Sequence, residues 1–390
     1  MTVFLTFARG WQTLAAVRSL GEKGIDVITS DSVKGASSYF SIYSRKHFIY
    51  KNFSNEEKFI NSLIKNIKKY SESTDDILIP VFKDIYIISK HLDKFKELVK
   101  VPITNYENLQ HVHDKWKLYL LAKKMGVRMP VTHRPRNKEE LKKLIPKLKF
   151  PLMIKILDSA GGVGVKCVYN KDELLFQYKK IIEEHKEEPL IQEYIQGKDY
   201  CVTVLFNKGK LKAKMSYLSE KQFPEKTGPT ILSKTVKEDE MEQMAFKICK
   251  KLNWHGVAEF DFRKEKNTGK PYLIECNPRF WASLNQSIKS HVDYPYLLYQ
   301  IATTGDCESQ LKPRVGIETE VYPGKIATEI HEVMKAKNKF LKVIKYLKHH
   351  RKIYEDIISL KDPLPVLGFI YPCYLLMKHG KIEVDNFINS

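Results

Sequence analysis

Short apolar runs alternate with amphipathic stretches in the first part of the chain. Residues 2–7 and 25–29 are apolar runs typical of strands, and residues 11–23 between them carry apolar side chains at helical spacing. A helical pattern at 55–70 and an apolar run at 77–81 continue the alternation. Strands that alternate with helices are typical of a parallel sheet, so an α/β domain is predicted here.

Further along, predicted strands follow one another with fewer helices between them. Helices are predicted at 114–125 and 239–252. The predicted strands are the apolar runs at 151–156, 189–195, 200–206, 255–262 and 271–279. A polar connection joins the last two runs, and this arrangement predicts a hairpin. The mixture predicts an α+β fold for this part of the chain.

The predicted hairpin carries oxygen-bearing side chains on one face of each strand. Because side chains alternate along a strand, Glu259 and Asp261 share a face, as do Glu275, Asn277 and Arg279. Pairing of the two strands is expected to bring Glu259 beside Glu275. Two carboxylates with an amide oxygen suit a hard cation such as Mg²⁺, and an arginine at the rim suits phosphate.

A lysine and a glycine-rich stretch form a second candidate motif. Lys155 occupies an inward position of an apolar strand, where a lysine is costly unless it meets an anion. Gly161, Gly162 and Gly164 follow, and glycines let backbone N–H groups approach phosphate oxygens closely. The alternative is an ordinary turn after a lysine that reaches solvent. The chain contains no GxxxxGK[ST], so a P-loop is excluded.

The end of the strand at 189–195 is a third candidate motif. Backbone groups at Tyr194 and Ile195 could hydrogen-bond the edge of a purine, and Asp199 could accept from ribose hydroxyls. The alternative is a strand that ends in a turn.

Composition places the chain among globular proteins with a strongly basic balance. It has 390 residues, of which 43% are hydrophobic and 29% charged, and a formal net charge of +20. Such a charge suits anionic partners, but no pattern of arginines and aromatics indicates nucleic-acid binding, so solvated lysines are the favoured interpretation. No nucleic-acid partner is expected.

The six cysteines and twelve histidines form no metal-binding or disulfide pattern. No CxxC occurs, and reduced thiols in a cytoplasmic protein fit best. The histidines are interpreted as surface residues. The apolar run at the N-terminus lacks a preceding basic segment, so it is not interpreted as a signal peptide, and no run is long enough to span a bilayer.

The chain changes character from about residue 311. Residues 325–352 are basic with a helical pattern, and residues 366–377 form an apolar run of interfacial length. The favoured interpretation is that this tail packs back on the rest of the chain or forms a dimer contact. The alternative is peripheral contact of residues 325–378 with an anionic membrane.

Taken in order, these motifs resemble the ATP-grasp superfamily, nearest to the carbamoyl-phosphate-synthase-like carboxylate–amine ligases. The resemblance covers about residues 1–305. It implies a Rossmann-like pre-ATP-grasp domain at 1–112 and an α+β ATP-grasp domain at 113–310, whose two subdomains divide near 188. A basic, partly apolar helical extension then occupies 311–390.

The resemblance also implies roles for the motif residues. Nucleotide binding is implied for Lys115, Lys155, Gly161, Gly162, Gly164, Glu193, Tyr194, Ile195 and Asp199. Metal binding is implied for Glu259, Glu275 and Asn277. Catalysis is implied for Arg279 and Lys155. Asp261 is expected to orient a neighbour.

The implied reaction needs ATP and Mg²⁺, with Mn²⁺ as an alternative metal. A substrate carboxylate would attack the γ-phosphorus and form an acyl phosphate, which an amine or similar nucleophile would convert to an amide. A kinase, a carboxylase and a non-catalytic, membrane-associated nucleotide-binding protein are the alternatives. The partners are small-molecule carboxylates and amines, expected near Lys221, Arg279 and Trp281. Their identity and the oligomeric state are not predicted.

Overall fold

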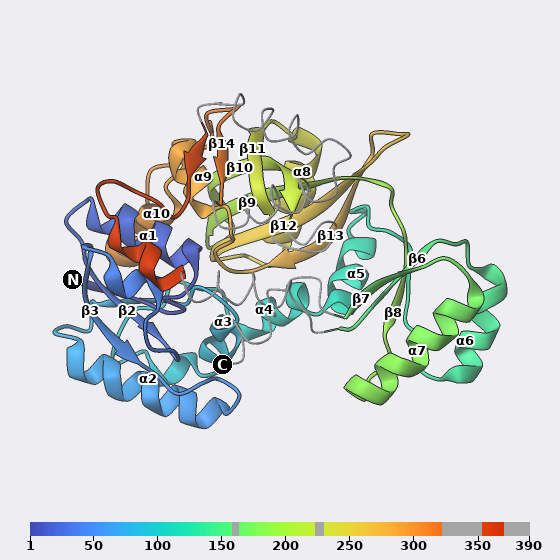
Figure 1. Cartoon of the computed structure of the whole chain (residues 1–390), viewed down its shortest axis with the longest axis horizontal. Helices are drawn as coiled ribbons and strands as arrows, with labels where there is room; N and C mark the ends of the chain where they lie inside the picture. The colour runs from blue at the N-terminus through green and yellow to red at the C-terminus, as the bar shows by residue number, and fades with distance from the viewer. Residues whose placement is uncertain (158–163, 223–229, 322–352, 370–390) are drawn as a thin grey trace, which may run out of the picture.

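Three β-sheets organise the chain in the computed structural model, which describes residues 1–157, 164–222, 230–321 and 353–369. Figure 1 shows an N-terminal sheet at the left, a long central sheet and a small sheet at the right. Short 3-10 helices connect some of the elements: η1 (Ser37–Phe40), η2 (Leu92–Lys94), η3 (Ile145–Lys147) and η4 (Leu364–Phe369).

The N-terminal sheet is parallel, as the alternation of strands and helices predicts, with the order β3-β2-β1-β4. Its strands are β1 (Thr2–Leu5), β2 (Asp26–Asp31), β3 (Ser44–Ile49) and β4 (Ile77–Ile79). Its helices are α1 (Trp11–Gly21), α2 (Glu56–Tyr70) and α3 (Asp84–Lys90), and α4 (Tyr106–His113) follows, with its buried side chains in the core of the central sheet. Apolar side chains cover both faces, which explains why the central strands are continuous apolar runs.

The central sheet has seven strands in the order β13-β12-β9-β10-β11-β14-β15. Its strands are β9 (Gly197–Asn207), β10 (Lys210–Gln222), β11 (Thr230–Val236), β12 (Gly256–Glu265), β13 (Pro271–Asn277), β14 (Glu318–Glu320) and β15 (Tyr354–Glu355). One face packs against α8 (Asp239–Lys251). The other face packs against α10 (Tyr294–Thr304), with α9 (Leu284–Lys289) beside it.

The N-terminal sheet and the central sheet share one hydrophobic core. Val3 and Leu5 of β1 belong to the same buried cluster as Leu205 of β9 and Leu298 of α10. Because these side chains are removed from water together, the two sheets are held in a fixed relation.

The small sheet has its own core and lies apart from the rest in Figure 1. Its order is β5-β8-β6-β7 and all its pairs are antiparallel. The strands are β5 (Thr132–His133), β6 (Leu152–Lys155), β7 (Val165–Val168) and β8 (Leu190–Glu193). Two helices, α6 (Lys138–Leu144) and α7 (Lys171–His185), accompany it, and α5 (Lys115–Lys124) leads into it. Asp114 caps α5 by accepting from Trp116 N and Lys117 N.

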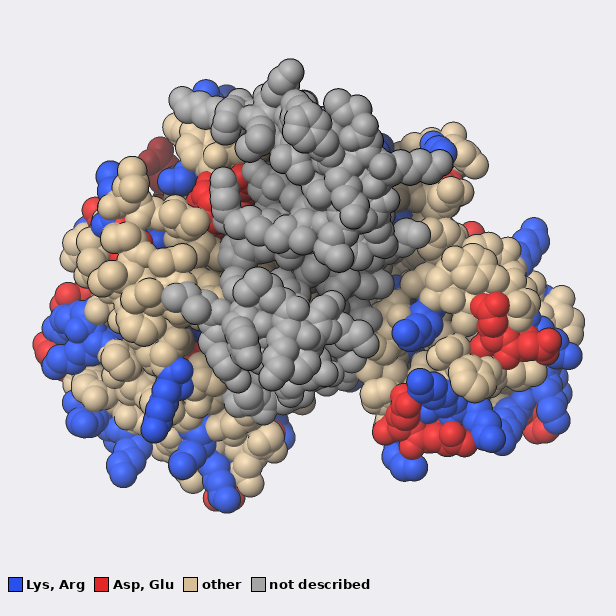
Figure 2. Space-filling view, in the orientation of Figure 1, with Lys and Arg blue, Asp and Glu red and all other residues tan. Residues whose placement is uncertain are grey.

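Basic side chains are distributed unevenly over the face drawn in Figure 2. Lysines and arginines gather over the N-terminal unit around α2, whereas both signs of charge mix over α6 and α7. The basic side chains on α2 lie on a solvent-facing helix surface, which fits the interpretation of solvated lysines.

Part of the predicted tail packs back on the N-terminal unit. Ile357 and Phe369 join Leu14 of α1 in a buried cluster, while Leu360 is fully exposed. The predicted basic helix at 325–352 and the end of the apolar run, residues 370–377, lie outside the described residues. Within the part of the chain that is described, no helix has the length and apolar character needed to cross a membrane.

A buried ion pair fastens this segment to α1. Arg18 Nε lies 2.9 Å from Asp362 Oδ2, and the Asp362 side chain is 1% exposed. Ser41 Oγ and the Ile42 backbone N–H also donate to the Asp362 carboxylate, at 2.8 and 3.0 Å. Asp362 therefore joins the tail to both α1 and the loop before β3.

We predict that Asp362→Ala lowers the free energy of unfolding by about 3 kcal/mol, because it leaves the Arg18 guanidinium without its buried partner. Urea denaturation measures the loss, and hydrogen exchange of residues 353–369 should rise. Asp93→Ala is the control, because Asp93 pairs with Lys96 at an exposed surface and should cost less than about 1 kcal/mol. Equal losses in the two variants would contradict the role of Asp362.

Candidate active site

The β12–β13 hairpin brings four oxygen-bearing side chains to one face of the central sheet. Glu259 pairs with Asn277, and Asp261 pairs with Glu275. Residues directly opposite each other on paired strands share a face, so all four side chains lie together. We call Glu259, Asp261, Glu275 and Asn277 the acidic cluster.

The register corrects one expectation. The sequence predicts Glu259 beside Glu275, but Asp261 is the residue opposite Glu275. The ladder with β9 fixes where β12 lies, and a bulge follows directly after Asp261. A bulge places two residues against one, and alternation of side chains alone does not reveal it.

Burial sets the charge state of the acidic cluster. Glu259 is 6% exposed, and the Tyr217 hydroxyl donates a hydrogen bond to its carboxylate. Burial raises the pKa of Glu259 to about 7, and the charge of Glu275 adds to the rise. Burial also raises the pKa of Asp261 well above its usual range, with further contributions from Glu259 and Glu275.

Glu275 titrates in the opposite direction. Burial opposes its ionisation, but the charges of Lys115 and Lys155 outweigh burial and lower the pKa of Glu275. Lys115 Nζ lies 3.9 Å from Glu275 Oε2. Glu275 is therefore the carboxylate that stays ionised.

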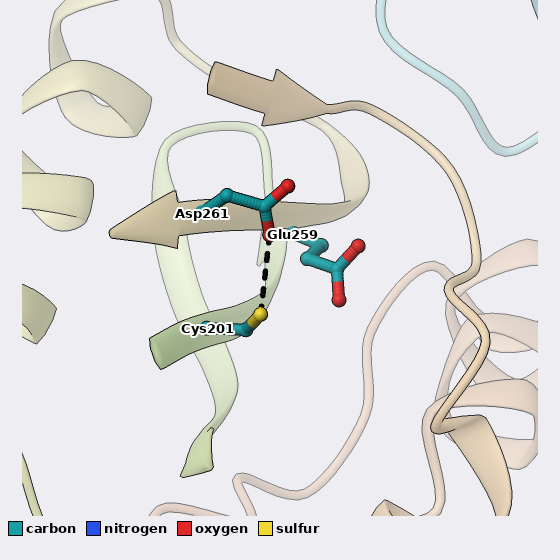
Figure 3. A group of neighbouring side chains, drawn as sticks. All are labelled: Cys201, Glu259 and Asp261. Carbon is teal, nitrogen blue, oxygen red and sulfur yellow. Dashed lines mark hydrogen bonds between the residues drawn. The ribbon is translucent and has the colours of Figure 1, made fainter. Parts of the chain in front are cut away.

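Asp261 accepts hydrogen bonds from residues of two neighbouring strands. Asn277 Nδ2 donates to Asp261 Oδ2 at 3.1 Å. Cys201 Sγ on β9 donates to Asp261 Oδ1 at 3.1 Å, and Figure 3 shows this contact beside Glu259. Burial raises the pKa of the Cys201 thiol well above its usual range. A protonated thiol donates hydrogen bonds and does not ligate a metal, so Cys201 supports Asp261.

The acidic cluster fits a divalent cation. Cys201, Glu259 and Asp261 each offer one possible ligand atom, and these three atoms lie within 4.8 Å of one another. With Cys201 excluded as a ligand, carboxylate and amide oxygens remain, which are the donors that Mg²⁺ and Mn²⁺ prefer. Carboxylates withdrawn from water with raised pKa values need a nearby positive charge to ionise together, and a divalent cation supplies it.

Arg279 is held between the hairpin and the N-terminal unit. Its Nη2 donates to Asn277 Oδ1 at 3.0 Å, and its Nη1 donates to the Phe280 carbonyl at 2.9 Å. The guanidinium lies 4.9 Å from the centroid of the Phe82 ring, which stacks on Phe7 at 4.3 Å. Phe82 follows β4, so a residue from the N-terminal unit supports an arginine at the acidic cluster.

The two predicted lysines lie beside the acidic cluster. Lys155 Nζ donates to Gln192 Oε1 at 2.6 Å, and Gln192 in turn donates to Thr132 at 2.9 Å. Burial lowers the pKa of Lys155 to about 8, while the charge of Glu275 opposes this shift. Lys115 and Lys155 thus lie close to one carboxylate and present two ammonium groups, as phosphate binding requires.

The glycine-rich stretch is described only at its end. Gly161 and Gly162 lie outside the described residues. Gly164 has a φ of +68°, and a Cβ there would lie 2.6 Å from the side chain of Ile156. Both the backbone conformation and the close packing require glycine at this position.

The proposed purine-binding residues lie where β8 leads into β9. Glu193 N donates to the Val131 carbonyl at 2.8 Å, and Glu193 Oε2 accepts from Val131 N at 3.2 Å. Ile195 is buried and Tyr194 is half-buried. A Cβ at Gly197 would lie 1.9 Å from the Lys264 carbonyl, so glycine permits the close approach of β9 to β12.

Asp199 has a partner that the sequence did not reveal. Arg263 Nε and Nη2 donate to its two carboxylate oxygens at 2.6 and 2.9 Å. The two residues are opposite each other on β9 and β12. Gln222 donates to the same carboxylate at 3.3 Å.

Trp281 corrects a second expectation. The sequence predicts it near a substrate pocket, but its side chain is fully buried and packs edge-on against Tyr294 with ring centroids 4.9 Å apart. It belongs to the core shared by the N-terminal and central sheets. Of the residues expected around the substrate, Arg279 is the one in contact with the acidic cluster.

Sequence reasoning missed Tyr217, Gln192, Phe82 and Cys201. Gln192 carried a local signal, because it is a polar side chain in the middle of an apolar strand. The other three reach the site from distant parts of the chain, and their local sequence does not mark them.

Comparison with known proteins agrees with this geometry. Residues 112–283 match the family model described as "ATP-grasp domain". "D-alanine--D-alanine ligase B" of Clostridium tetani is 28% identical over 183 residues, which are 40% of this chain and 50% of that protein. The chain thus spans about half the length of this curated relative.

Solved structures share the fold at low sequence identity. Biotin carboxylase from Campylobacter jejuni has a TM-score of 0.67 at 18% identity, over 81% of this chain and 74% of its own. N5-carboxyaminoimidazole synthetase from Staphylococcus aureus has a TM-score of 0.63 at 17% sequence identity, over 80% of this chain and 79% of its own. L-amino acid ligase from Bacillus licheniformis has a TM-score of 0.60 at 15% sequence identity, over 79% of this chain and 75% of its own. The resemblance to the ATP-grasp superfamily is therefore confirmed by the match of residues 112–283 to its domain model.

We predict that Glu259→Gln stabilises the metal-free protein at about pH 8. The raised pKa of Glu259 means that its ionisation costs stability as the pH rises from about 4.5 to 7. Removing this charge restores on the order of 2 kcal/mol, or about 5 °C in Tm. Thermal melts in EDTA measure the change, which should disappear at about pH 3.5, below the pKa of this carboxyl in both the folded and the unfolded chain.

The same variant should lose the rise in Tm that Mg²⁺ produces in the wild type, because it removes a charged ligand. Glu57→Gln is the control, since Glu57 is exposed on α2 and should change neither property. A variant that melts at or below the wild-type temperature in EDTA, yet still responds to Mg²⁺, would exclude the assignment of Glu259.

Proposed function

We propose that this protein is an ATP- and Mg²⁺-dependent ligase that activates a small-molecule carboxylate as an acyl phosphate and joins it to an amine. One observation carries the proposal: the acidic cluster lies beside Lys115, Lys155 and Arg279 within an ATP-grasp domain. Oxygen ligands for a metal next to cations for phosphate oxygens are what phosphoryl transfer requires.

The relatives support this class of reaction. The curated relative is by name a D-alanine–D-alanine ligase, and one of the proteins that share the fold is an L-amino acid ligase. Both names describe enzymes that join amino acids. We infer that small carboxylates and amines, amino acids among them, are the substrates to test first.

We infer the following division of labour along the chain. Residues 1–112 act as a Rossmann-like pre-ATP-grasp domain, residues 113–310 hold the nucleotide between two subdomains that divide near 188, and residues 311–390 form a basic extension. The parallel N-terminal sheet and the separate core of the small sheet support this division.

The residues divide the chemical tasks. Lys115 and Lys155 bind the nucleotide phosphates, and Glu259, Glu275 and Asn277 hold the metal. Bound Mg²⁺ would neutralise charge on the phosphate oxygens.

Arg279 stabilises the phosphoryl group as the substrate carboxylate attacks the γ-phosphorus and ADP leaves. The amine then displaces phosphate from the acyl phosphate. The protein mainly positions the reactants and compensates the developing charge.

Nucleotide specificity belongs to the strand junction at β8 and β9. Glu193, Tyr194 and Ile195 line the adenine pocket in this proposal, and Asp199 accepts from the ribose hydroxyls. The pairing of Asp199 with Arg263 fixes the orientation of its carboxylate, which supports a role in positioning.

A carboxylase is the second candidate, because the fold is shared with biotin carboxylase at a TM-score of 0.67. In that case bicarbonate would be the carboxylate that is activated. Mass spectrometry of the products separates the candidates, since a ligase yields an amide, a carboxylase a carboxylated acceptor and a kinase a phosphorylated one.

A cytoplasmic location with peripheral membrane contact through residues 325–378 completes the proposal. Exposed Leu360, Leu364 and Leu367 near the C-terminal end of the described chain support a contact surface. Liposome flotation with and without residues 311–390 tests it.

The main test is an ADP-release screen with ATP, Mg²⁺ and pools of amino acids and small carboxylic acids. We predict turnover by the wild type and a loss of about 10³-fold in Glu275→Gln, which removes a charged ligand without changing side-chain volume. Circular dichroism checks that the variant is folded, and Glu57→Gln is the control. Wild-type turnover in Glu275→Gln excludes the metal assignment. The function itself fails if no pool releases ADP and calorimetry detects no ATP binding.

A second prediction concerns the support of Arg279. Phe82→Leu keeps an apolar side chain but removes the ring face under the guanidinium, so kcat should fall about fivefold, in line with about 1 kcal/mol for a cation–π contact. The KM for ATP should stay unchanged, because Phe82 contacts Arg279 and not the lysines that hold the phosphates. Phe48→Leu is the matched control, since Phe48 stacks on Tyr70 instead. Equal kcat losses in both variants would show that Phe82 acts through packing alone and would exclude its support of Arg279.

A further inference from the structure

A cavity of about 530 Å³ lies where the start of α4, the β9–β10 turn and the connection from α8 to β12 meet. Its polar lining includes Asn105, Asn253, Lys208, Lys251, His111 and His255. It shares no lining residue with the candidate active site. The cavity is therefore a second hollow with its own chemistry.

The charges around this cavity have one sign. Lys208 and Lys251 bring two ammonium groups, and the lining contains no carboxylate. Among the ion pairs of the described residues, neither lysine has a carboxylate within 4.0 Å. Many other lysines of this chain do have such partners, as Lys212 and Lys214 on the same hairpin show. Both lysines are exposed to solvent, so two positive charges stand at the mouth of the cavity without an ion-pair partner among the described residues.

His255 adds an unpaired polar atom. Its Nδ1 is buried and has no hydrogen-bond partner among the described residues. Burial lowers the pKa of His255, and the charge of Lys208 lowers it further. A buried polar atom without a partner costs stability, and the His255 side chain that carries it also lines the cavity.

The walls of the cavity are held in place by contacts between the three segments. Gly209 N donates to the Trp254 carbonyl at 2.8 Å, and Asn108 Nδ2 donates to the Leu252 carbonyl at 2.7 Å. Asn105 caps α4 by accepting from Asn108 N at 2.8 Å, so the positive end of this helix dipole lies at the cavity. The donors are consequently arranged before any ligand arrives.

We propose that this cavity binds a small phosphorylated anion. Two lysine ammonium groups, an imidazole, asparagine amides and a helix N-terminus together suit a tetrahedral oxyanion with several acceptor oxygens. The lining has no arginine fork, which is the group that favours planar carboxylates. The volume leaves room for an organic group beyond the phosphate. His255 immediately precedes β12, so the ligand contacts the strand that carries Glu259 and Asp261.

The test must report on this cavity alone, because phosphate is also a product of the proposed reaction and can bind at the catalytic site. Side-chain NMR of His255 in the full-length protein, labelled with ¹⁵N-histidine, meets this need, and His255→Gln assigns the signal. Inorganic phosphate at constant ionic strength is the probe. We expect it to raise the pKa of His255 by about one unit, because a nearby anion favours the imidazolium.

The double substitution of Lys208→Gln and Lys251→Gln should abolish this response. Lys138→Gln is the control, since Lys138 is exposed on α6 and should leave the response intact. Unchanged His255 signals in phosphate overturn the proposal, as does an equal response in the double variant. A response to citrate but not to phosphate also overturns it, because it identifies a polycarboxylate site. The measurement needs no ATP turnover, so its outcome is independent of the ligase activity.

Discussion

The repulsion between carboxylates gathered on one face of the β12–β13 hairpin is the constraint on which the rest of the structure depends. Glu259 is buried, Asp261 is half-buried and the Glu275 side chain is 33% exposed, and like charges this close cannot ionise together without compensation. Compensation comes from Lys115 on α5 and Lys155 on β6, two elements that are separate from the hairpin. The small sheet and the helix that leads to it are thus connected electrostatically to the central sheet.

The N-terminal unit takes part in the same arrangement through packing. Its core is continuous with that of the central sheet, and Phe82 supports the guanidinium of Arg279. A cation that rests on an aromatic ring keeps its charge while it loses conformational freedom. The unit therefore serves the site by fixing the position of one positive charge, whatever else it binds. This role is consistent with an N-terminal sheet that shares a hydrophobic core with the central sheet and is not joined to it by a flexible linker alone.

The sequence predicted the elements of this site better than their relations. The alternation within β12, β13 and β6 is local, so the acidic cluster and Lys155 could be recognised along the chain, whereas Lys115 was implied by the family resemblance. The register of Glu259 against Asn277 depends on a bulge and on pairing with β9, and Phe82 reaches Arg279 from almost two hundred residues away. Strand β3 was missed because its mostly exposed, charged sequence carries little apolar signal. Long-range pairing decides these features, and no local pattern encodes it.

The candidate active site and the hollow beside α4 hold their charges under different conditions. Glu259 is buried and the pKa of its carboxyl is raised to about 7, so ionisation there costs stability. A bound cation would remove that cost, and the free energy of binding would then include this relief. Lys208 and Lys251 are exposed to solvent, as the lysines on α2 are, so their charges carry no such cost, whereas the unpartnered Nδ1 of His255 does. Burial of charged and polar groups, and not the net charge of +20, is therefore the basis for proposing that the acidic cluster holds a metal.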